Sequence, residues 1–152
     1  MSQDSMPLND EDVVLFQQAA DLLQEVHDPV IHQVAAALRT RSGNTYRGIH
    51  LGSRRINVCA ESSAIANAEM ALDHEIEVIV AVCKDDAGRI IVTNPCGVCR
   101  ELLTTYGKDT QVLVDLAGIV RKVPASALLP EPWLFPHENE WTVEDPSSEG
   151  TT

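Results

Sequence analysis

The sequence lacks several features that would assign it to other classes of protein. Aromatic residues make up only 4% of its 152 residues, and its four cysteines are too few for a disulfide-stapled miniature scaffold. No apolar stretch approaches the roughly 20 residues that cross a bilayer. The acidic N-terminus lacks the basic-then-apolar layout of a secretory signal. Because 44% of the residues are apolar, the chain can fill the core of one domain, and we expect a soluble, cytoplasmic protein with no membrane partner.

Basic residues are also scarce. The chain has 11 Lys and Arg against 23 Asp and Glu, a formal net charge of −12. Residues 1–12 and 136–152 hold nine of the acids and no Lys or Arg. A polynucleotide partner needs a basic footprint, which no part of the chain provides, so we expect a small-molecule substrate and no nucleic acid polymer. We divide the chain into a flexible N-terminal tail (1–8), one domain (9–135) and an acidic, mobile C-terminal tail (136–152).

The apolar periodicity predicts helices that alternate with strands. Helices are expected at 9–27, 59–72 and 96–106, and strands at 34–39, 45–51, 76–83, 90–92, 112–115 and 119–123. The stretch 76–83 is almost continuously apolar, which is typical of a central strand buried on both faces. The pattern predicts an α/β sandwich with mixed strand pairing, because hairpins coexist with crossovers.

Two short motifs place cysteines at the starts of predicted helices. One is Cys59-Ala60-Glu61, and the other is Pro95-Cys96-Gly97-Val98-Cys99. In a reducing compartment a C-x-x-C pair is more often metal-binding or redox-active than a structural disulfide. A helix N-terminus carries partial positive charge and favours thiolate over thiol, so Cys59, Cys96 and Cys99 can converge on one ion.

A zinc ion with three protein ligands keeps a fourth position for water and lowers the pKa of that water to roughly 7. Glu61 follows Cys59 on the same helical turn and can act as the catalytic proton shuttle without taking a coordination position. This layout, followed by Pro-Cys-x-x-Cys, is that of zinc deaminases. The alternative is a closed structural zinc site with Cys83 as fourth ligand. Glu61 would have no role there, and we expect Cys83 to be a packed core thiol.

These motifs resemble those of the small cytidine deaminases with three cysteine ligands and of the blasticidin S deaminases. The resemblance covers most of residues 34–133 and includes Val34-Ala35-Ala36-Ala37-Leu38, Gly43, Gly48, Leu128-Leu129-Pro130 and Trp133. It implies a three-layer α/β/α sandwich with a mixed five-stranded sheet, one catalytic Zn²⁺ per subunit and a homotetramer, with a homodimer as the alternative. The implied activity is hydrolytic deamination of a cytosine-type nucleoside or nucleoside analogue with release of ammonia.

The sequence departs from the cytidine deaminases where they bind ribose. Their N-x-E pair corresponds here to His50 and Gly52, and the segment leading to Cys59 is shorter, which resembles the blasticidin S deaminases. Candidate substrates are therefore cytidine or deoxycytidine, blasticidin S, or a free aminated base or heterocycle. A non-catalytic zinc-stabilised binding scaffold remains an alternative function, and RNA editing is disfavoured by the charge balance.

The candidate site residues extend beyond the motifs. The substrate-binding candidates are Ala60, His50, His32, Arg54, Arg55 and Trp133, and the candidate that compensates the surplus thiolate charge is Arg100, with Arg54 and Arg55 as alternatives. A histidine at a strand end is more often structural than a ligand contact. The two loop arginines can equally be solvated or lie at a subunit contact, and Trp133 can cover a neighbouring active site or fill an interface groove.

Overall fold

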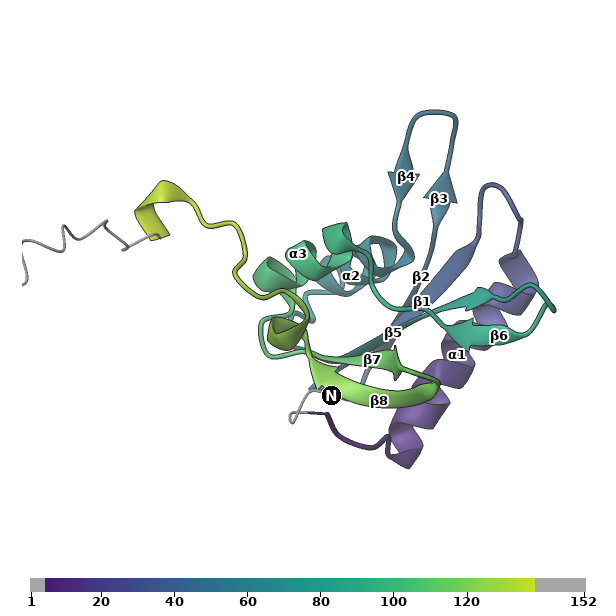
Figure 1. Cartoon of the computed structure of the whole chain (residues 1–152), viewed down its shortest axis with the longest axis horizontal. Coiled ribbons are helices and arrows are strands. Elements are labelled where there is room, and N and C mark those ends of the chain that lie inside the picture. Colours follow the sequence, from purple (N-terminus) through teal and green to yellow (C-terminus); the bar gives the residue numbers. More distant parts are fainter. Residues whose placement is uncertain (1–4, 139–152) are drawn as a thin grey trace, which may run out of the picture.

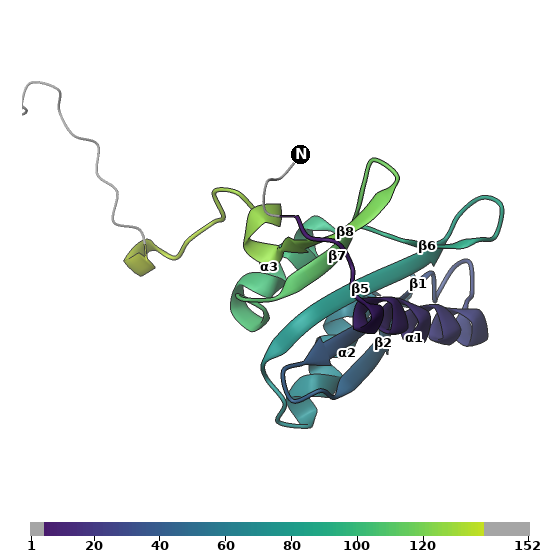
Figure 2. The same ribbon diagram turned by 90° about the horizontal axis from the view of Figure 1, so that it is seen from below.

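The computed structural model of the chain describes residues 5–138; residues 1–4 and 139–152, which belong to the predicted tails, lie outside this range. One helix covers one face of a central sheet, and two helices cover the other (Figures 1 and 2). The helices are α1 (Asp10–Val26), α2 (Ala60–Met70) and α3 (Gly97–Tyr106), followed by the 3-10 turns η1 (Ala125–Leu128) and η2 (Pro136–Glu138). The predicted α/β/α sandwich is confirmed. Within the described residues, no helix combines the length and apolarity needed to cross a membrane.

The main sheet is mixed, as expected. Its five strands run in the order β2-β1-β5-β7-β8, and β6 pairs with the end of β5 as a sixth. Strands β5 and β7 are parallel, whereas the other pairs are antiparallel. The strands are β1 (Val34–Thr40), β2 (Thr45–Ile49), β5 (Ile76–Lys84), β6 (Ile90–Val92), β7 (Gln111–Leu116) and β8 (Ile119–Pro124).

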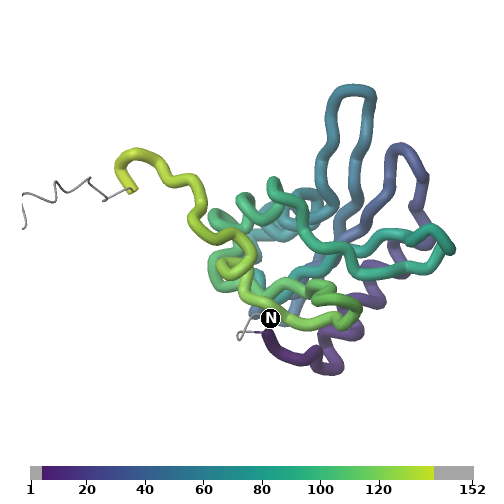
Figure 3. The backbone as a smooth tube through the Cα atoms, viewed as in Figure 1, coloured from purple at the N-terminus to yellow at the C-terminus, as the bar shows by residue number. Residues whose placement is uncertain are grey.

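The strand expected over 45–51 ends earlier than predicted. In the β1–β2 register Ile49 lies opposite Ala35, so β2 has almost no further residue of β1 to pair with. The chain leaves the sheet and forms a separate hairpin from β3 (Leu51–Gly52) and β4 (Asn57–Val58). Figure 3 shows this hairpin projecting from the body of the molecule.

The central strand β5 is buried on both faces, as its apolar run indicates. Val78, Val80 and Val82 pack in the core under α1. Ile79 and Ala81 pack in the core under α2 and α3. This alternation follows from the two-residue period of a strand.

A buried ionic cluster anchors α1. The sequence pattern did not indicate it. Asn9 caps the helix, and Asp12 returns the hydrogen bond in a capping box. The carboxylate of Asp12 also lies 3.0 Å from Arg39 Nη2 on β1 and 2.8 Å from Lys122 Nζ on β8. Asp12 therefore ties the first turn of the helix to two strands that are distant in sequence.

Residues 5–8 differ from the flexible tail predicted for 1–8. The backbone groups of Met6 and Lys122 exchange two hydrogen bonds of 2.8 Å, and Arg121 donates to Ser5. Strand β8 is at the edge of the sheet, where unpaired N–H and C=O groups are available to another segment. The start of the described chain covers part of this edge.

Helix α2 lies very close to strand β2, and Gly48 permits this approach. A Cβ atom placed on Gly48 would lie 2.5 Å from the carbonyl oxygen of Ala60 and 2.8 Å from the carbonyl carbon of Ser63. Both atoms belong to the helix backbone and cannot turn away as a side chain would. The first turn of α2 is therefore held directly against the sheet.

We expect Gly48→Ala to lower the free energy of unfolding by about 1–3 kcal/mol, because the added methyl group forces α2 away from β2. Gly97→Ala is a matched control, since a Cβ there meets nothing within 4 Å. Urea unfolding of the metal-free proteins measures both changes. Equal stability of the two variants would contradict the close packing.

Asp73 holds the β1–β2 turn through a converging set of hydrogen bonds. Its Oδ2 atom accepts from Thr40 at 2.7 Å, Ser42 at 2.8 Å, Tyr46 at 3.0 Å and Asn44 at 3.2 Å. The hydrogen bond from Thr40 contributes most to lowering the pKa of Asp73 to about 2. The ionised carboxylate therefore stabilises the fold.

This shift predicts a specific pH dependence. The pKa of an unfolded Asp is about 3.9, so the stabilisation by Asp73 is fully present above that value and is lost as the pH falls towards 2. We expect wild type to exceed Asp73→Asn in stability at pH 7, with the difference shrinking below about pH 4. Denaturant unfolding between pH 7 and 3 measures this. Asp109→Asn, at an exposed aspartate, should show no such trend.

Candidate metal centre

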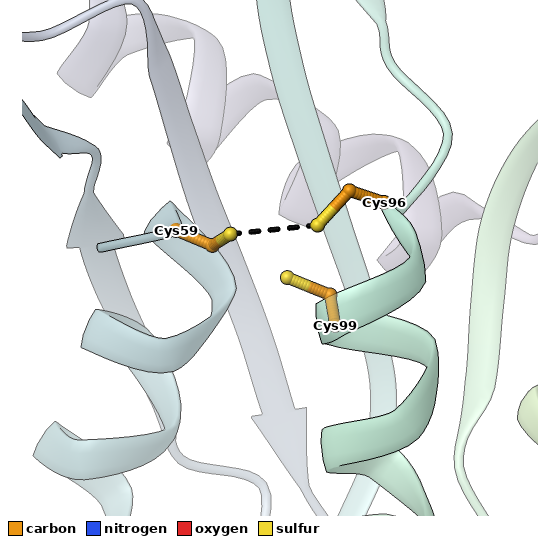
Figure 4. Close-up of side chains that lie close together, drawn as sticks. All are labelled: Cys59, Cys96 and Cys99. Carbon is orange, nitrogen blue, oxygen red and sulfur yellow. Dashed lines mark hydrogen bonds between the residues drawn. The ribbon is translucent and has the colours of Figure 1, made fainter. Parts of the chain in front are cut away.

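Two helix N-termini bring three cysteines together. Cys59 is the N-cap of α2, Cys96 is the N-cap of α3, and Cys99 lies in the first turn of α3. The side chain of Cys59 forms no capping hydrogen bond to α2. Figure 4 shows the three sulfur atoms facing a common point between the helices.

The spacing of the sulfur atoms fits a tetrahedral metal ion. The three Sγ atoms lie within 4.8 Å of one another, and those of Cys59 and Cys96 are 3.5 Å apart. Zinc–sulfur bonds of about 2.3 Å at tetrahedral angles place sulfur atoms about 3.8 Å apart. Thiolates are the soft ligands that zinc accepts. The three cysteines therefore suit a metal ion such as zinc.

Cys83 is not part of this cluster. It lies near the end of β5, half-buried, and the group of possible ligands found in residues 5–138 contains only the other three cysteines. A structural site with Cys83 as fourth ligand does not match this geometry.

The three thiols differ in their electrostatic environment. Burial raises the pKa of Cys59 and, more strongly, that of Cys99. Burial acts in the same direction on Cys96, but the backbone N–H groups of Cys99 and Val98 and the thiols of Cys59 and Cys99 together outweigh it, and the pKa of Cys96 lies below its ordinary value. The α3 N-terminus thus favours a thiolate at Cys96.

Glu61 lies beside the cluster, in the first turn of α2. Its residue is only 6% exposed, and burial raises the pKa of its carboxyl group. The Cys99 thiol acts in the opposite direction as a hydrogen-bond partner. Glu61 is therefore a buried carboxyl group next to a candidate metal ligand.

Arg100 directs its guanidinium group to backbone carbonyls near the cluster. Its Nε donates to Pro95 O at 2.8 Å, and its Nη1 donates to Leu128 O at 3.1 Å. The side chain fixes the loop that carries Cys96 and places a positive charge in this region. It also links this loop to η1.

The two candidate histidines, His32 and His50, link the segment before β1 to the end of β2. His32 Nδ1 lies 2.8 Å from the carbonyl oxygen of His50. The His50 ring is buried, accepts the N–H of Gln33 at Nδ1 (3.0 Å) and lies 2.8 Å from Asn57 Oδ1 at Nε2. A substrate contact by the His50 ring would require one of these bonds to break. Gln33 and Asn57 were not among the candidates, since nothing in their sequence context marks them.

The other substrate-binding candidates lie in different surroundings. Ala60 is buried at the start of α2, next to Cys59. Arg54 and Arg55 are exposed at the tip of the β3–β4 hairpin. Trp133 is exposed and forms an edge-to-face pair with Phe135, with ring centroids 4.7 Å apart. It follows η1 in the chain. Figure 3 shows the yellow C-terminal segment of the described chain running away from the body of the molecule. The role of Trp133 at a subunit boundary, like the homotetramer itself, stays a prediction.

Known structures share this arrangement of sheet and helices. A cytidine deaminase from Burkholderia pseudomallei is 26% identical, with a TM-score of 0.67 over 83% of this chain and 100% of its own. A cytidine deaminase from Bacillus anthracis has the same fold, with 23% identity and a TM-score of 0.70 over 82% of this chain and 90% of its own. The fold and the three-cysteine cluster define the class of the cytidine deaminase-like hydrolases.

The sequence has a relative in the same class. The chain is 33% identical to blasticidin-S deaminase from Bacillus cereus over 129 residues. This match covers 81% of the chain and 92% of the relative. No model of a protein family matches the chain. The chain belongs to the cytidine deaminase-like family that includes blasticidin-S deaminase, and it is a hydrolytic deaminase.

The cluster predicts one zinc ion per chain. Since removing even a residue that supports a ligand costs about 10–100-fold in metal affinity, loss of a ligand should cost more than about 100-fold. We expect this for Cys99→Ser, measured by elemental analysis and competition with a chromogenic chelator. Cys83→Ser is the matched control and should bind zinc like wild type. An equal loss of zinc affinity in both variants would instead support the closed structural site with four cysteine ligands.

Proposed function

We propose that the protein is a zinc-dependent deaminase of a cytosine-type nucleoside or nucleoside analogue and releases ammonia. The observation that carries this proposal is the buried carboxyl group of Glu61, which lies beside Cys99 in the cluster of three thiols. A site that only stabilises the fold has no use for such a group. Cys59, Cys96 and Cys99 would hold the zinc ion, and Glu61 would be the catalytic residue.

The reaction replaces an amino group by an oxygen atom. Water adds to the amine-bearing carbon of the ring, the carbon–nitrogen bond breaks, and ammonia leaves. When bound, zinc supplies a Lewis acid that lowers the pKa of a coordinated water to about 7. The Glu61 carboxylate takes a proton from the attacking water and passes it to the ring nitrogen beside that carbon. Glu61 then transfers the remaining proton of the added hydroxyl group to the amine, which leaves as ammonia while the carbon–oxygen double bond forms.

The charge of the site favours a neutral or cationic substrate. Three thiolates exceed the charge of one Zn²⁺ ion, and Glu61 adds a carboxyl group nearby. Arg100 offsets part of this charge, although two of its donors are used by Pro95 and Leu128. A nucleotide phosphate close to the metal would meet net negative charge. A nucleoside or its analogue avoids this repulsion.

Two features support a nucleoside analogue such as blasticidin S ahead of plain cytidine. His50 and Gly52 stand where the cytidine deaminases have the Asn and Glu that bind ribose, and neither offers a carboxylate to a sugar hydroxyl. One relative, 33% identical to this chain, is a blasticidin-S deaminase. A free aminated base remains a second substrate class, since it needs no sugar contact.

A substrate panel tests the proposal. The zinc-loaded protein is incubated with blasticidin S, cytidine, deoxycytidine, cytosine and guanine, and turnover is measured by ammonia release and ultraviolet absorbance. We expect turnover of at least one cytosine-type compound. Glu61→Gln should retain zinc and lose about 10²–10⁴-fold in kcat, because the amide cannot transfer the protons.

Glu69→Gln provides the matched control, because it makes the same substitution on the same helix at a residue that contacts His74. It should keep wild-type turnover. An active Glu61→Gln variant would refute the assigned role of Glu61. A protein that binds zinc and turns over no member of the panel would instead be a binding scaffold.

A further inference from the structure

His50 occupies the point where the chain leaves the main sheet. It follows the last residue of β2 and precedes β3. Its backbone N–H still donates to Val34 O at 2.8 Å, so the residue remains attached to β1. The hairpin that starts after it leads directly to Cys59.

The imidazole of His50 has one arrangement of donor and acceptor that satisfies both of its contacts. The backbone N–H of Gln33 can only donate, so Nδ1 must be the unprotonated acceptor. Nε2 then carries the proton and donates to Asn57 Oδ1 at 2.8 Å. The ring thereby connects the segment before β1 with strand β4.

Few other interactions hold strand β4. The β3–β4 hairpin has two residue pairs, Leu51 with Val58 and Gly52 with Asn57. A two-stranded hairpin of this size is at best marginally stable by itself. Cys59 follows β4 immediately, and its side chain forms no cap on α2. The bond from His50 to Asn57 therefore adds a link to the main sheet just before this cysteine.

The His50 ring is also fitted tightly against the hairpin. A Cβ on Gly52 would lie 3.0 Å from His50 Cε1, 3.2 Å from His50 Nε2 and 3.1 Å from Val30 O. The absence of a side chain at position 52 leaves this space to the ring. The ring is thus confined between β3 and the segment before β1.

We propose that His50 is a positioning residue for the metal centre: through Asn57 it keeps the start of α2 placed so that the Cys59 thiol faces Cys96 and Cys99. This inference rests on the proposed metal site. Without the bond, β4 is held mainly by its two residue pairs with β3, and Cys59 leaves the other two sulfur atoms more often. The expected consequence is faster release of the metal.

Two substitutions test the two hydrogen bonds of the His50 ring one at a time. The amide of His50→Asn lies where Nδ1 lies, so it can still accept from Gln33 but does not reach Asn57. The amide of His50→Gln reaches the position of Nε2 and can still donate to Asn57. Both variants remove the ring, so a general packing defect would affect them alike.

The readout is the rate at which zinc passes from each loaded protein to an excess of a chromogenic chelator. We expect release to be about 10–100-fold faster for His50→Asn and close to wild type for His50→Gln. Asn57→Ala, at an exposed residue, should match His50→Asn. The double variant should be no faster than either single variant, because both remove the same bond.

His74→Asn is the matched control, since this exposed histidine contacts only Glu69 among the hydrogen bonds described and should leave release unchanged. Wild-type release rates in both His50→Asn and Asn57→Ala would overturn this inference but not the metal site. Equally fast release from His50→Asn and His50→Gln would also overturn it in favour of a packing role. A wild-type chain that binds no zinc would instead overturn the metal site itself.

Discussion

Close packing of helix α2 on strand β2 is the constraint on which the metal centre depends. At Gly48 the strand leaves no room for a side chain, and the helix backbone lies directly over it. This contact sets where α2 begins and therefore where Cys59 and Glu61 lie relative to α3. The thiol of Cys59 must meet that of Cys96 from a different helix, 37 residues away, at 3.5 Å. A small displacement of α2 would separate the sulfur atoms that the site requires.

The site brings together groups that can carry negative charge, and their surroundings affect their ionisation in opposite directions. Backbone N–H groups at the start of α3 favour the thiolate of Cys96, whereas burial disfavours the ionised forms of Cys59, Cys99 and Glu61. A divalent cation resolves this conflict, since it neutralises most of the thiolate charge at once. Protein cations play a smaller part here, because Arg100 divides its donors between two carbonyl oxygens.

His50 and the start of the β3–β4 hairpin depart from the ribose-binding pattern of the cytidine deaminases. Where the resemblance to cytidine deaminases leads one to expect Asn and Glu, the chain has a buried imidazole and a glycine. The two positions are sterically coupled, because a side chain at Gly52 would crowd the His50 ring. Both ring nitrogens of His50 form internal hydrogen bonds, one with Gln33 and one with Asn57.

Local patterns in the sequence determined the helices, most strands and the placement of Cys96 and Cys99 on one helical turn, because these follow from backbone periodicity over a few residues. The motifs were also enough to recognise the family. Tertiary structure alone decided that His50 turns both ring nitrogens inward, that β2 ends at Ile49, and that Asp12 is buried between Arg39 and Lys122. These features join segments far apart in the chain. Strand register and packing set such distances, and neither is encoded in the spacing of neighbouring residues.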